Sequence, residues 1–265
     1  MQLRQGSCHG HHNCQRNVRP VMPAEPESQC RSTTEASGTP TGCVDAAGGI
    51  DPGELARRSV EFETEPAEKV IKWTLDRFGG SIALACSFQD CVIVDLLVRV
   101  DPGIEVIFLE TGFHFPETLA FVEEVRELFD LNLLMIKPGP EAAAWPCGTP
   151  HCCELRKVEP LDRALEGREA WLTGLKRCDA STRAHAPIVS WDHARGLVKV
   201  NPMATWTDDD VDHYVADHGL PVHPLIAQGY LSIGCAPTTR PVASGEDPRA
   251  GRWAGTGKVE CGLHA

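Results

Sequence analysis

The cysteines of this chain lie in arrangements that favour nucleophilic or metal chemistry. The 265 residues include twelve cysteines. We expect no disulfide framework, because no apolar run resembles a signal peptide or a membrane span. Cys261 opens the last five residues, Cys261-Gly262-Leu263-His264-Ala265. A thiol so near a chain end suits a nucleophile that moves between two partners better than a core residue, although by itself it could be a stray exposed thiol.

Two adjacent cysteines, Cys152 and Cys153, form a second candidate site. Neighbouring cysteines bond to each other only with strain, whereas two thiolates side by side suit a shared metal cluster. Arg156 and Lys157 follow within one helical turn and could offset the negative charge of such a cluster. The alternative, two small core residues at the start of a helix, stays open at this point.

Three arginines follow Cys235, at Arg240, Arg249 and Arg252. A guanidinium group matches the geometry of phosphate or sulfate, and the glycine, proline and tryptophan between the arginines favour a shaped loop over a solvated helix face. Residues 235–265 carry 4 basic and 3 acidic side chains, whereas residues 51–150 carry 8 and 18. The net charge of −12 argues against a general nucleic-acid or anionic-membrane partner, so we expect a small anionic ligand held locally.

The elements that must position these groups alternate between strand and helix. Short apolar runs predict buried parallel strands at 81–86, 106–109, 131–136 and 171–173. Helices are expected between them at 66–78, 91–98 and 116–129, with capped helix starts at Asp51 and Thr207 and an antiparallel pair at 188–189 and 197–200. This alternation predicts the α/β class: an open, mostly parallel sheet with helices on both faces.

Polar turns follow three of these strands, at 87–90, 110–112 and from Gly174 onward. Ligands of open α/β sheets bind outside the carboxyl ends of the strands, so these turns are expected to border the site. A polar turn that opens a helix can bind phosphate or ribose. The turn at Ser87 has no glycine and is not a Walker motif, so it is weak evidence by itself.

Residues 1–49 contain no aromatic side chain and are rich in Gly, Pro, Ser and Thr, which predicts a disordered N-terminal extension. Their histidines and cysteines could bind a metal, but the spacing fits no closed site; they are Cys8, His9, His11, His12 and Cys14. We predict one ordered domain over 50–265, with a mobile C-terminal catalytic tail from about residue 241.

Six stretches together make the chain resemble the assimilatory sulfonucleotide reductases, of the adenylylsulfate (APS) reductase type. They are 109–118, 152–161, 173–183, 199–202, 230–240 and 249–264, in the order of the family, and they span about residues 55–265. The resemblance implies an adenine-nucleotide alpha-hydrolase-like sheet, a cytoplasmic enzyme, APS as substrate, AMP as product and a thioredoxin or glutaredoxin-like reductant. A homo-oligomer is compatible with it, and no membrane or nucleic-acid partner is expected.

The resemblance also implies roles for individual residues. Cys261 would attack the sulfur of APS, expel AMP and become a cysteine S-sulfonate, which thioredoxin would reduce to release sulfite. Five residues match the family's phosphosulfate contacts: Lys157, Arg183, Arg249, Arg252 and His264. Ser87 and Gly174 match parts of its nucleotide site.

The family pattern pairs the tandem cysteines with a later Cys-x-x-Cys to hold a [4Fe-4S] cluster. Here Cys235 is present, but the second position is Thr238, a poor ligand for iron. Three explanations stay open: a foreign fourth ligand, another cysteine, of which Cys147 is the nearest in sequence to the tandem pair, or an absent or labile cluster. We predict a cluster held by Cys152, Cys153 and Cys235.

Three other functions stay open. The chain could reduce 3'-phospho-APS (PAPS) without a cluster. It could be an ATP-using adenylyltransferase or sulfurtransferase, which would normally show a Ser-Gly-Gly-Lys-Asp-Ser-like loop that the turn at Ser87 lacks. A non-catalytic iron–sulfur or zinc module is the third, and it would leave Cys261 and the arginines without a role.

Overall fold

The computed structural model describes residues 50–256 and 258–264. The predicted extension over 1–49, with its candidate metal ligands, lies outside the described residues. All eight cysteines in the described part of the chain are free thiols.

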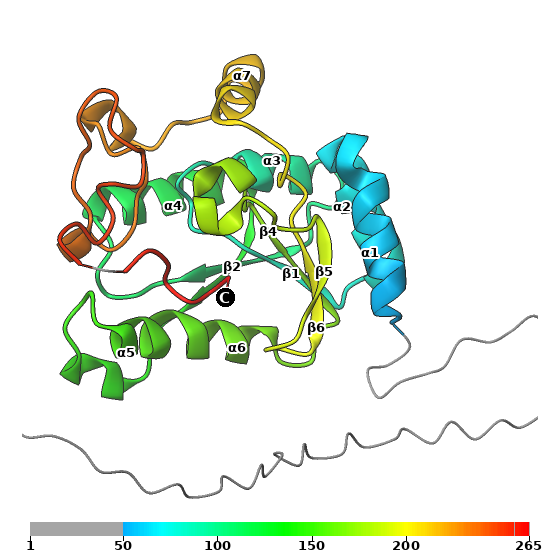
Figure 1. Ribbon diagram of the computed structural model, residues 1–265, viewed down its shortest axis with the longest axis horizontal. Coiled ribbons are helices and arrows are strands. Elements are labelled where there is room, and N and C mark those ends of the chain that lie inside the picture. The colour runs from blue at the N-terminus through cyan, green and yellow to red at the C-terminus, as the bar shows by residue number, and fades with distance from the viewer. Residues whose placement is uncertain (1–49, 257, 265) are drawn as a thin grey trace, which may run out of the picture. The chain divides into compact units, whose positions relative to one another are not determined.

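A six-stranded sheet forms the centre of the described domain (Figure 1). Its order is β3-β2-β1-β4-β6-β5. Five strands run parallel and β5 pairs antiparallel with β6. The strands are β1 (Ile82–Ala85), β2 (Glu105–Leu109), β3 (Asn132–Ile136), β4 (Ala170–Thr173), β5 (Val189–Asp192) and β6 (Leu197–Val200). The predicted parallel strands and the predicted antiparallel pair are confirmed.

The chain reverses its direction of travel across the sheet between β1 and β4. From β1 it proceeds outward to β2 and β3, and it then returns to place β4 on the other side of β1. Ala85 at the end of β1 pairs with Thr173 at the end of β4. The turns that follow these two strands therefore leave the sheet side by side, at the switch point where open α/β sheets bind ligands.

One face of the sheet is covered by four helices: α1 (Pro52–Glu61), α2 (Ala67–Phe78), α3 (Val92–Val98) and α4 (Pro116–Phe129). Their apolar residues pack on strand residues such as Leu84, Phe108 and Leu172. Asp51 accepts a hydrogen bond from the Gly53 N–H (2.8 Å) and caps α1 as predicted. The helix α7 (Asp208–His218) begins at a capping box formed by Thr207 and Asp210.

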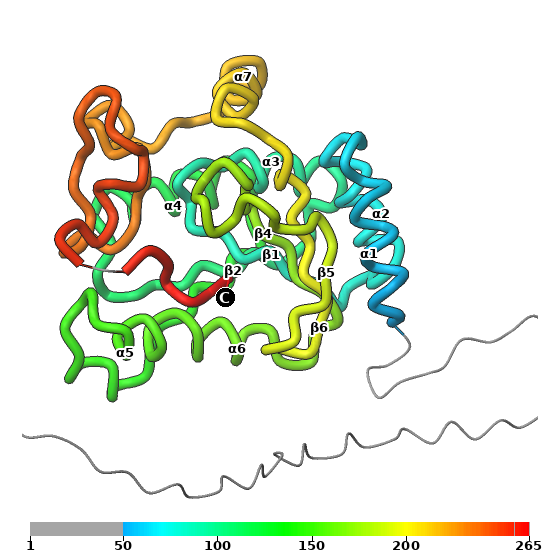
Figure 2. The backbone as a smooth tube through the Cα atoms, in the orientation of Figure 1, coloured from blue at the N-terminus to red at the C-terminus, as the bar shows by residue number. Residues whose placement is uncertain are grey.

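The opposite face is covered by α6 (Glu159–Leu165) and by the end of the chain. Leu161 and Leu165 of α6 pack on Trp171, and Leu263 packs against the same cluster. The tube view shows the last residues running between α6 and the sheet (Figure 2). The predicted helices on both faces are thus confirmed. Four helices cover one face, whereas α6 and the end of the chain cover the other.

A π-helical turn, Glu154–Val158, joins the short helix α5 (Pro150–Cys153) to α6. The Glu159 N–H bonds to the Glu154 carbonyl five residues back. Pro160 follows and has no N–H to complete an α-helical bond, so the wide turn persists. We did not predict this turn, which is of a kind that often occurs at functional sites. Six short 3-10 turns complete the described chain: Phe62–Thr64, Pro140–Ala144, Arg177–Asp179, Ser181–Arg183, Ile226–Gln228 and Ala236–Thr238.

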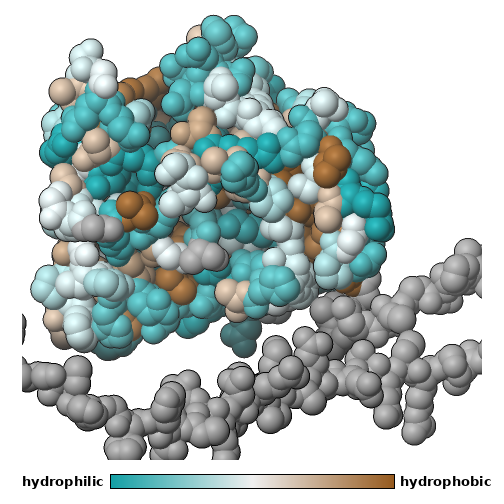
Figure 3. All heavy atoms as spheres, in the orientation of Figure 1, coloured by the Kyte–Doolittle hydropathy of each residue, from teal (hydrophilic) through white to brown (hydrophobic). Residues whose placement is uncertain are grey.

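The surface facing the viewer in Figure 3 is mainly hydrophilic, with small and separate hydrophobic spots. Within the described residues, no helix combines the length and the apolar character that crossing a membrane requires.

Candidate active site

A cavity of about 600 Å³ opens at the carboxyl ends of β1 and β4. Its position follows from the switch point, because the turns after these two strands form part of its wall. The structure brings eight of the predicted site residues to this one cavity: Ser87, Lys157, Gly174, Arg183, Arg249, Arg252, Cys261 and His264. They come from both strand ends, the π-helical turn, the loop after β4 and the C-terminal tail.

The turn after β1 is held in a strained backbone conformation. Phe88 has φ +54°, a region that bulky side chains avoid. Its ring is fully buried against Phe108, with the ring centroids 5.6 Å apart, and this packing holds the backbone in place. Gln89 accepts a hydrogen bond from the Ile233 N–H (3.0 Å) and so ties this turn to the loop before Cys235. The Ser87 turn is therefore a rigid wall of the cavity.

Gly174 lies directly after β4, against the side chain of Ile93. A Cβ at this position would lie 3.2 Å from Ile93 Cγ2, so glycine lets the turn pass close to helix α3. The cavity wall on this side is backbone without a side chain, which leaves room for a ligand.

Lys157 is carried into the cavity by the π-helical turn. Burial lowers the pKa of its ammonium group, but the electrostatic influence of the nearby Cys235 and Cys261 side chains raises it by more, so the pKa stays above its ordinary value. Lys157 is therefore a permanent cation placed within electrostatic reach of both cysteines.

Arg183 and Arg249 converge on one carboxylate, that of Glu260. Arg183 Nη2 lies 2.8 Å from Glu260 Oε2, and Arg249 Nη2 lies 3.4 Å from the same oxygen. Burial raises the pKa of Glu260, yet the hydrogen bond and charge of Arg183, with the charge of Arg249, bring it below the usual value. The residue before Cys261 thus holds an anion between two guanidinium groups.

Arg252 is buried against the loop that leads to Cys235. Its Nη1 donates to Ser232 Oγ (3.2 Å) and to the Ile233 carbonyl (3.1 Å). A Cβ on Gly234 would collide with the guanidinium, so a larger residue there would displace Arg252 from this position. Burial and the charge of Arg249 lower the pKa of Arg252. Within the described residues its Nε has no hydrogen-bond partner, which leaves a donor available beside the cavity.

His264 stacks on Trp171, with ring centroids 6.0 Å apart and planes 4° from parallel. Burial lowers the pKa of His264 well below its usual value, and the charges of Lys199 and Arg183 add to the effect. Its imidazole is therefore neutral at neutral pH. His264 can exchange hydrogen bonds with a ligand but adds no positive charge, so the cationic character of the cavity comes from the lysine and the arginines.

The three predicted metal ligands, Cys152, Cys153 and Cys235, are buried, and their chain neighbours Lys157 and Gly234 line the cavity. The Cys152 N–H bonds to Thr149 Oγ1 (3.2 Å) at the start of α5. The interaction with the Cys147 thiol, and to a smaller extent the charge of Lys157, lowers the pKa of Cys235 in spite of its burial. The described chain therefore gathers reduced thiols beside permanent cations.

A family comparison identifies the chain. Residues 81–241 match the model of the phosphoadenosine phosphosulfate reductase domain. The chain belongs to this reductase family. The adenosine 5'-phosphosulfate reductase of Mycolicibacterium smegmatis is 45% identical over 223 residues, which cover 80% of this chain and 94% of that protein. The protein of the same name from Streptomyces coelicolor is 43% identical over 78% of this chain and 92% of its own length. The predicted sulfonucleotide reductase family and the oxidoreductase class are confirmed.

Solved structures resemble this reductase in fold. A phosphoadenylyl-sulfate (PAPS) reductase from Candida auris, determined as a phosphate complex, aligns with a TM-score of 0.64 at 24% identity, covering 72% of this chain and 98% of its own. An FMN adenylyltransferase of Candida glabrata aligns with a TM-score of 0.53 at 17% identity, over 70% and 64% of the two chains. At such identities the likeness shows the fold alone, and it confirms the predicted nucleotide alpha-hydrolase-like sheet.

Arg156 makes structural contacts that the sequence did not predict. It donates to the carbonyls of Thr111 (2.6 Å) and Ala142 (2.7 Å), and its guanidinium lies 4.3 Å from the centre of the Phe113 ring. Arg156 therefore joins the loop after β2 to the segment before the tandem cysteines. Two of its nitrogens are thus used on backbone carbonyls, while the guanidinium keeps its positive charge.

Two residues of the tail were missed by sequence reasoning. Lys258 Nζ lies 2.8 Å from Cys153 Sγ, so a second lysine reaches the tandem cysteines. Glu260 occupies the arginine pair described above. The available signal was their place within three residues of Cys261, but nothing in the sequence shows which way either side chain points.

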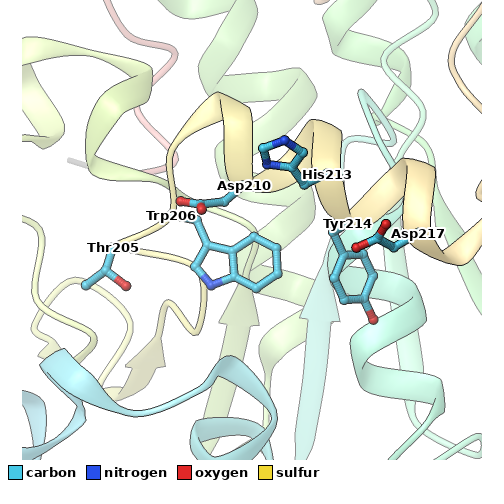
Figure 4. A pocket seen from close by; sticks show the side chains of 6 residues that line it. All are labelled: Thr205, Trp206, Asp210, His213, Tyr214 and Asp217. Carbon is cyan, nitrogen blue, oxygen red and sulfur yellow. The ribbon is translucent and has the colours of Figure 1, made fainter.

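A second hollow, of about 360 Å³, lies along α7 and holds none of the predicted site residues (Figure 4). Its walls are Thr205, Trp206, Asp210, His213, Tyr214 and Asp217. Asp210 already accepts hydrogen bonds from Thr207 as part of the helix cap. The hollow therefore has no free cation or thiol among its walls to match the chemistry of this reductase family.

Proposed function

We propose that this reductase converts APS to sulfite and AMP through Cys261, with a thioredoxin or glutaredoxin-like dithiol as reductant. The observation that carries the proposal is the position of Cys261 in the same cavity as Lys157, Arg183, Arg249 and Arg252. The two relatives that are 43 to 45% identical, both named adenosine 5'-phosphosulfate reductase, support APS as the substrate.

The cavity offers separate places for the two halves of APS. The turns at Ser87 and Gly174, at the carboxyl ends of β1 and β4, suit the adenosine and its phosphate. The cationic side chains suit the sulfate, because guanidinium and ammonium groups bind oxyanions by charge-assisted hydrogen bonds. Glu260 is the internal anion that the substrate's sulfate would displace or approach.

The chemical step is a displacement at sulfur. The Cys261 thiolate attacks the sulfate sulfur of APS, a new S–S bond forms, and the bond from that sulfur to the bridging oxygen breaks. Its electron pair leaves with AMP, and Cys261 becomes an S-sulfonate. Lys157 is placed to neutralise the thiolate and the bound sulfate together, which is needed before two anions can meet.

The reductive step needs the tail to leave the cavity. A thiolate of the dithiol attacks Cys261 Sγ, and sulfite leaves with the electron pair of the S–S bond. The second thiol then attacks the mixed disulfide and restores Cys261, while the reductant becomes a disulfide. Leu263 and His264 are the contacts that hold the tail on Trp171, so their release would expose Cys261.

A [4Fe-4S] cluster is part of the proposal, and the donor set supports it. Cys152, Cys153 and Cys235 are buried, reduced and accompanied by two lysines. Within the described chain, these sulfurs do not form a group of three donors within 4.8 Å of one another. A single zinc ion with Zn–S bonds of about 2.3 Å would need such convergence, whereas a multi-iron cluster spans a wider spacing. When bound, it would supply a charged, polarisable group beside Lys157.

The replacement Cys261→Ser tests the reaction. We expect it to bind AMP as the wild type does and to form no sulfite, because serine is a far weaker nucleophile at neutral pH. Wild-type protein given APS without a reductant should gain the mass of one SO3 group on the peptide that contains Cys261. The matched control Cys178→Ser removes an exposed thiol in the wall of the same cavity and should keep both activities, because only Cys261 forms the adduct.

Two results would contradict the proposal. One is an SO3 adduct on a cysteine other than Cys261, or on none. The other is faster turnover of PAPS than of APS when the two are assayed side by side, which would favour the alternative substrate.

A further inference from the structure

We propose that Cys147 is the fourth cysteine ligand of the cluster, in the place where Thr238 stands instead of a cysteine. The inference rests on the proposed function, since it concerns the cluster that we include there. It assigns a metal ligand that lies outside the family's cysteine pattern.

Cys147 lies directly against Thr238, although the two residues are 91 positions apart in sequence. The Cys147 Sγ is 3.7 Å from Thr238 Oγ1. The next residue, Gly148, has φ +96°, and a Cβ there would lie 3.1 Å from Thr238 Cγ2. The backbone of this segment therefore passes close over Thr238, and the sulfur of Cys147 lies beside the site that a cysteine at 238 would fill.

The loop of Cys147 is tied to the helix that carries the tandem cysteines. Thr149 Oγ1 donates to the Pro146 carbonyl (3.1 Å) and accepts from the Cys152 N–H (3.2 Å). One hydroxyl thus connects the residue before Cys147 with the first turn of α5. Because Cys147 belongs to the same short unit as Cys152 and Cys153, its sulfur has a defined position relative to theirs.

The chemistry of the donor atoms favours the thiol over the hydroxyl. Iron–sulfur clusters are held by cysteine thiolates, usually four of them, and a threonine hydroxyl does not ionise in the range where a thiol does. Thr238 Oγ1 is instead within 3.4 Å of the Cys235 carbonyl, to which it donates. With Cys147 added to Cys152, Cys153 and Cys235, the set of four sulfurs is complete without Thr238.

The test measures iron and acid-labile sulfide in the anaerobically purified full chain, together with Mössbauer spectra. The variants are Cys147→Ser, Thr238→Cys and the two combined, with Cys178→Ser as the control for loss of a thiol outside the set. We expect about four irons per chain in the wild type. We expect Cys147→Ser to lose one iron site or more, and the combined variant to recover the wild-type iron content, because it returns a cysteine to position 238. Cys178→Ser should match the wild type.

Each possible result either supports or overturns Cys147 as a ligand of the cluster. Wild-type iron content and spectrum in Cys147→Ser would overturn the inference, as would a combined variant that stays depleted while remaining folded by circular dichroism. Wild-type protein without iron would overturn both the inference and the cluster in the proposed function. The SO3 adduct on Cys261 is measured separately, so a failure of Cys147 as ligand can be told from a failure of the proposed reaction.

Discussion

The two faces of the central sheet are covered in different ways. One face lies under α1, α2, α3 and α4, which build a continuous apolar core with it. The other lies under α6 and the last residues of the chain. A chain end can leave its place without unfolding the rest of the domain, so we propose that the face covered by α6 and the tail opens and closes during the reaction.

Charged side chains are also distributed unequally between the two faces of the sheet. On the thinly covered face, Trp171 lies under His264 and beside two cations, Lys199 at 5.2 Å and Arg195 at 5.3 Å from its ring. The thickly covered face buries mainly apolar side chains. One face is thus mainly apolar, and the other carries an imidazole and two cations around one tryptophan.

We expect the two faces to differ most in how much their side chains contribute to the free energy of unfolding. Leu172 is fully buried under the helices, whereas Leu263 only partly packs on the opposite face. We expect Leu172→Ala to lower the free energy of unfolding by about 2–5 kcal/mol. Leu263→Ala should lower it by less than about 1 kcal/mol, because the tail opens before the domain unfolds. Urea denaturation of both variants measures this, and equal losses would refute the division.

Lys157 tests whether the thin face works mainly in catalysis. We expect Lys157→Ala to reduce APS turnover roughly ten- to a hundred-fold, from a charge-assisted contact on the order of 1.5–3 kcal/mol that acts in the transition state. The midpoint of urea unfolding should change little. Arg163→Ala is a suitable control, since Arg163 is exposed on α6 and outside the cavity. An unchanged turnover number in Lys157→Ala would remove this lysine from the site.

The next prediction concerns Glu260, and it asks whether this carboxylate competes with the ligand for Arg183 and Arg249. The variant Glu260→Gln leaves Arg183 and Arg249 without their carboxylate, so we expect APS to bind about five-fold more tightly, or ~1 kcal/mol, and the affinity for AMP, which has no sulfate, to change little. The control Glu246→Gln breaks a similar pair with Arg240 outside the cavity and should leave affinity unchanged. Calorimetric titration measures both. Weaker binding by Glu260→Gln would show that the carboxylate positions the arginines instead of competing with the ligand.

The smallest effect concerns the pH dependence of stability. Burial, together with the charges of Arg195 and Arg183, lowers the pKa of Lys199 to about 8, although Asp192 and Glu260 act in the opposite direction. Between pH 8 and the usual lysine value of about 10.5, the unfolded chain binds more protons at this site than the folded one. The contribution of Lys199 to the free energy of unfolding therefore rises with pH across that window. Lys199→Met should remove this rise, and parallel pH profiles of the two proteins would contradict it.

The strands could be predicted from the sequence because their apolar runs are local and are bounded by turns. The Ser87 and Gly174 turns could be assigned to one end of the sheet, since parallel strands end together. The π-helical turn was missed, because an extra residue in a helical turn leaves no periodic signal over so short a stretch. The contacts of Arg156 could not be predicted, because its sequence place next to the tandem cysteines does not reveal that its guanidinium reaches the carbonyls of Thr111 and Ala142.

By itself the sequence determined the α/β class, the family and the residue types available for chemistry, because these depend on local pattern and on residue identity. The tertiary structure alone decided which of those residues meet. It placed Lys258 on Cys153, Glu260 between two arginines and Cys147 against Thr238. Such contacts join segments up to 105 residues apart, and they depend on how loops cross in space. That arrangement is fixed by packing over the whole domain and not by any single stretch of chain.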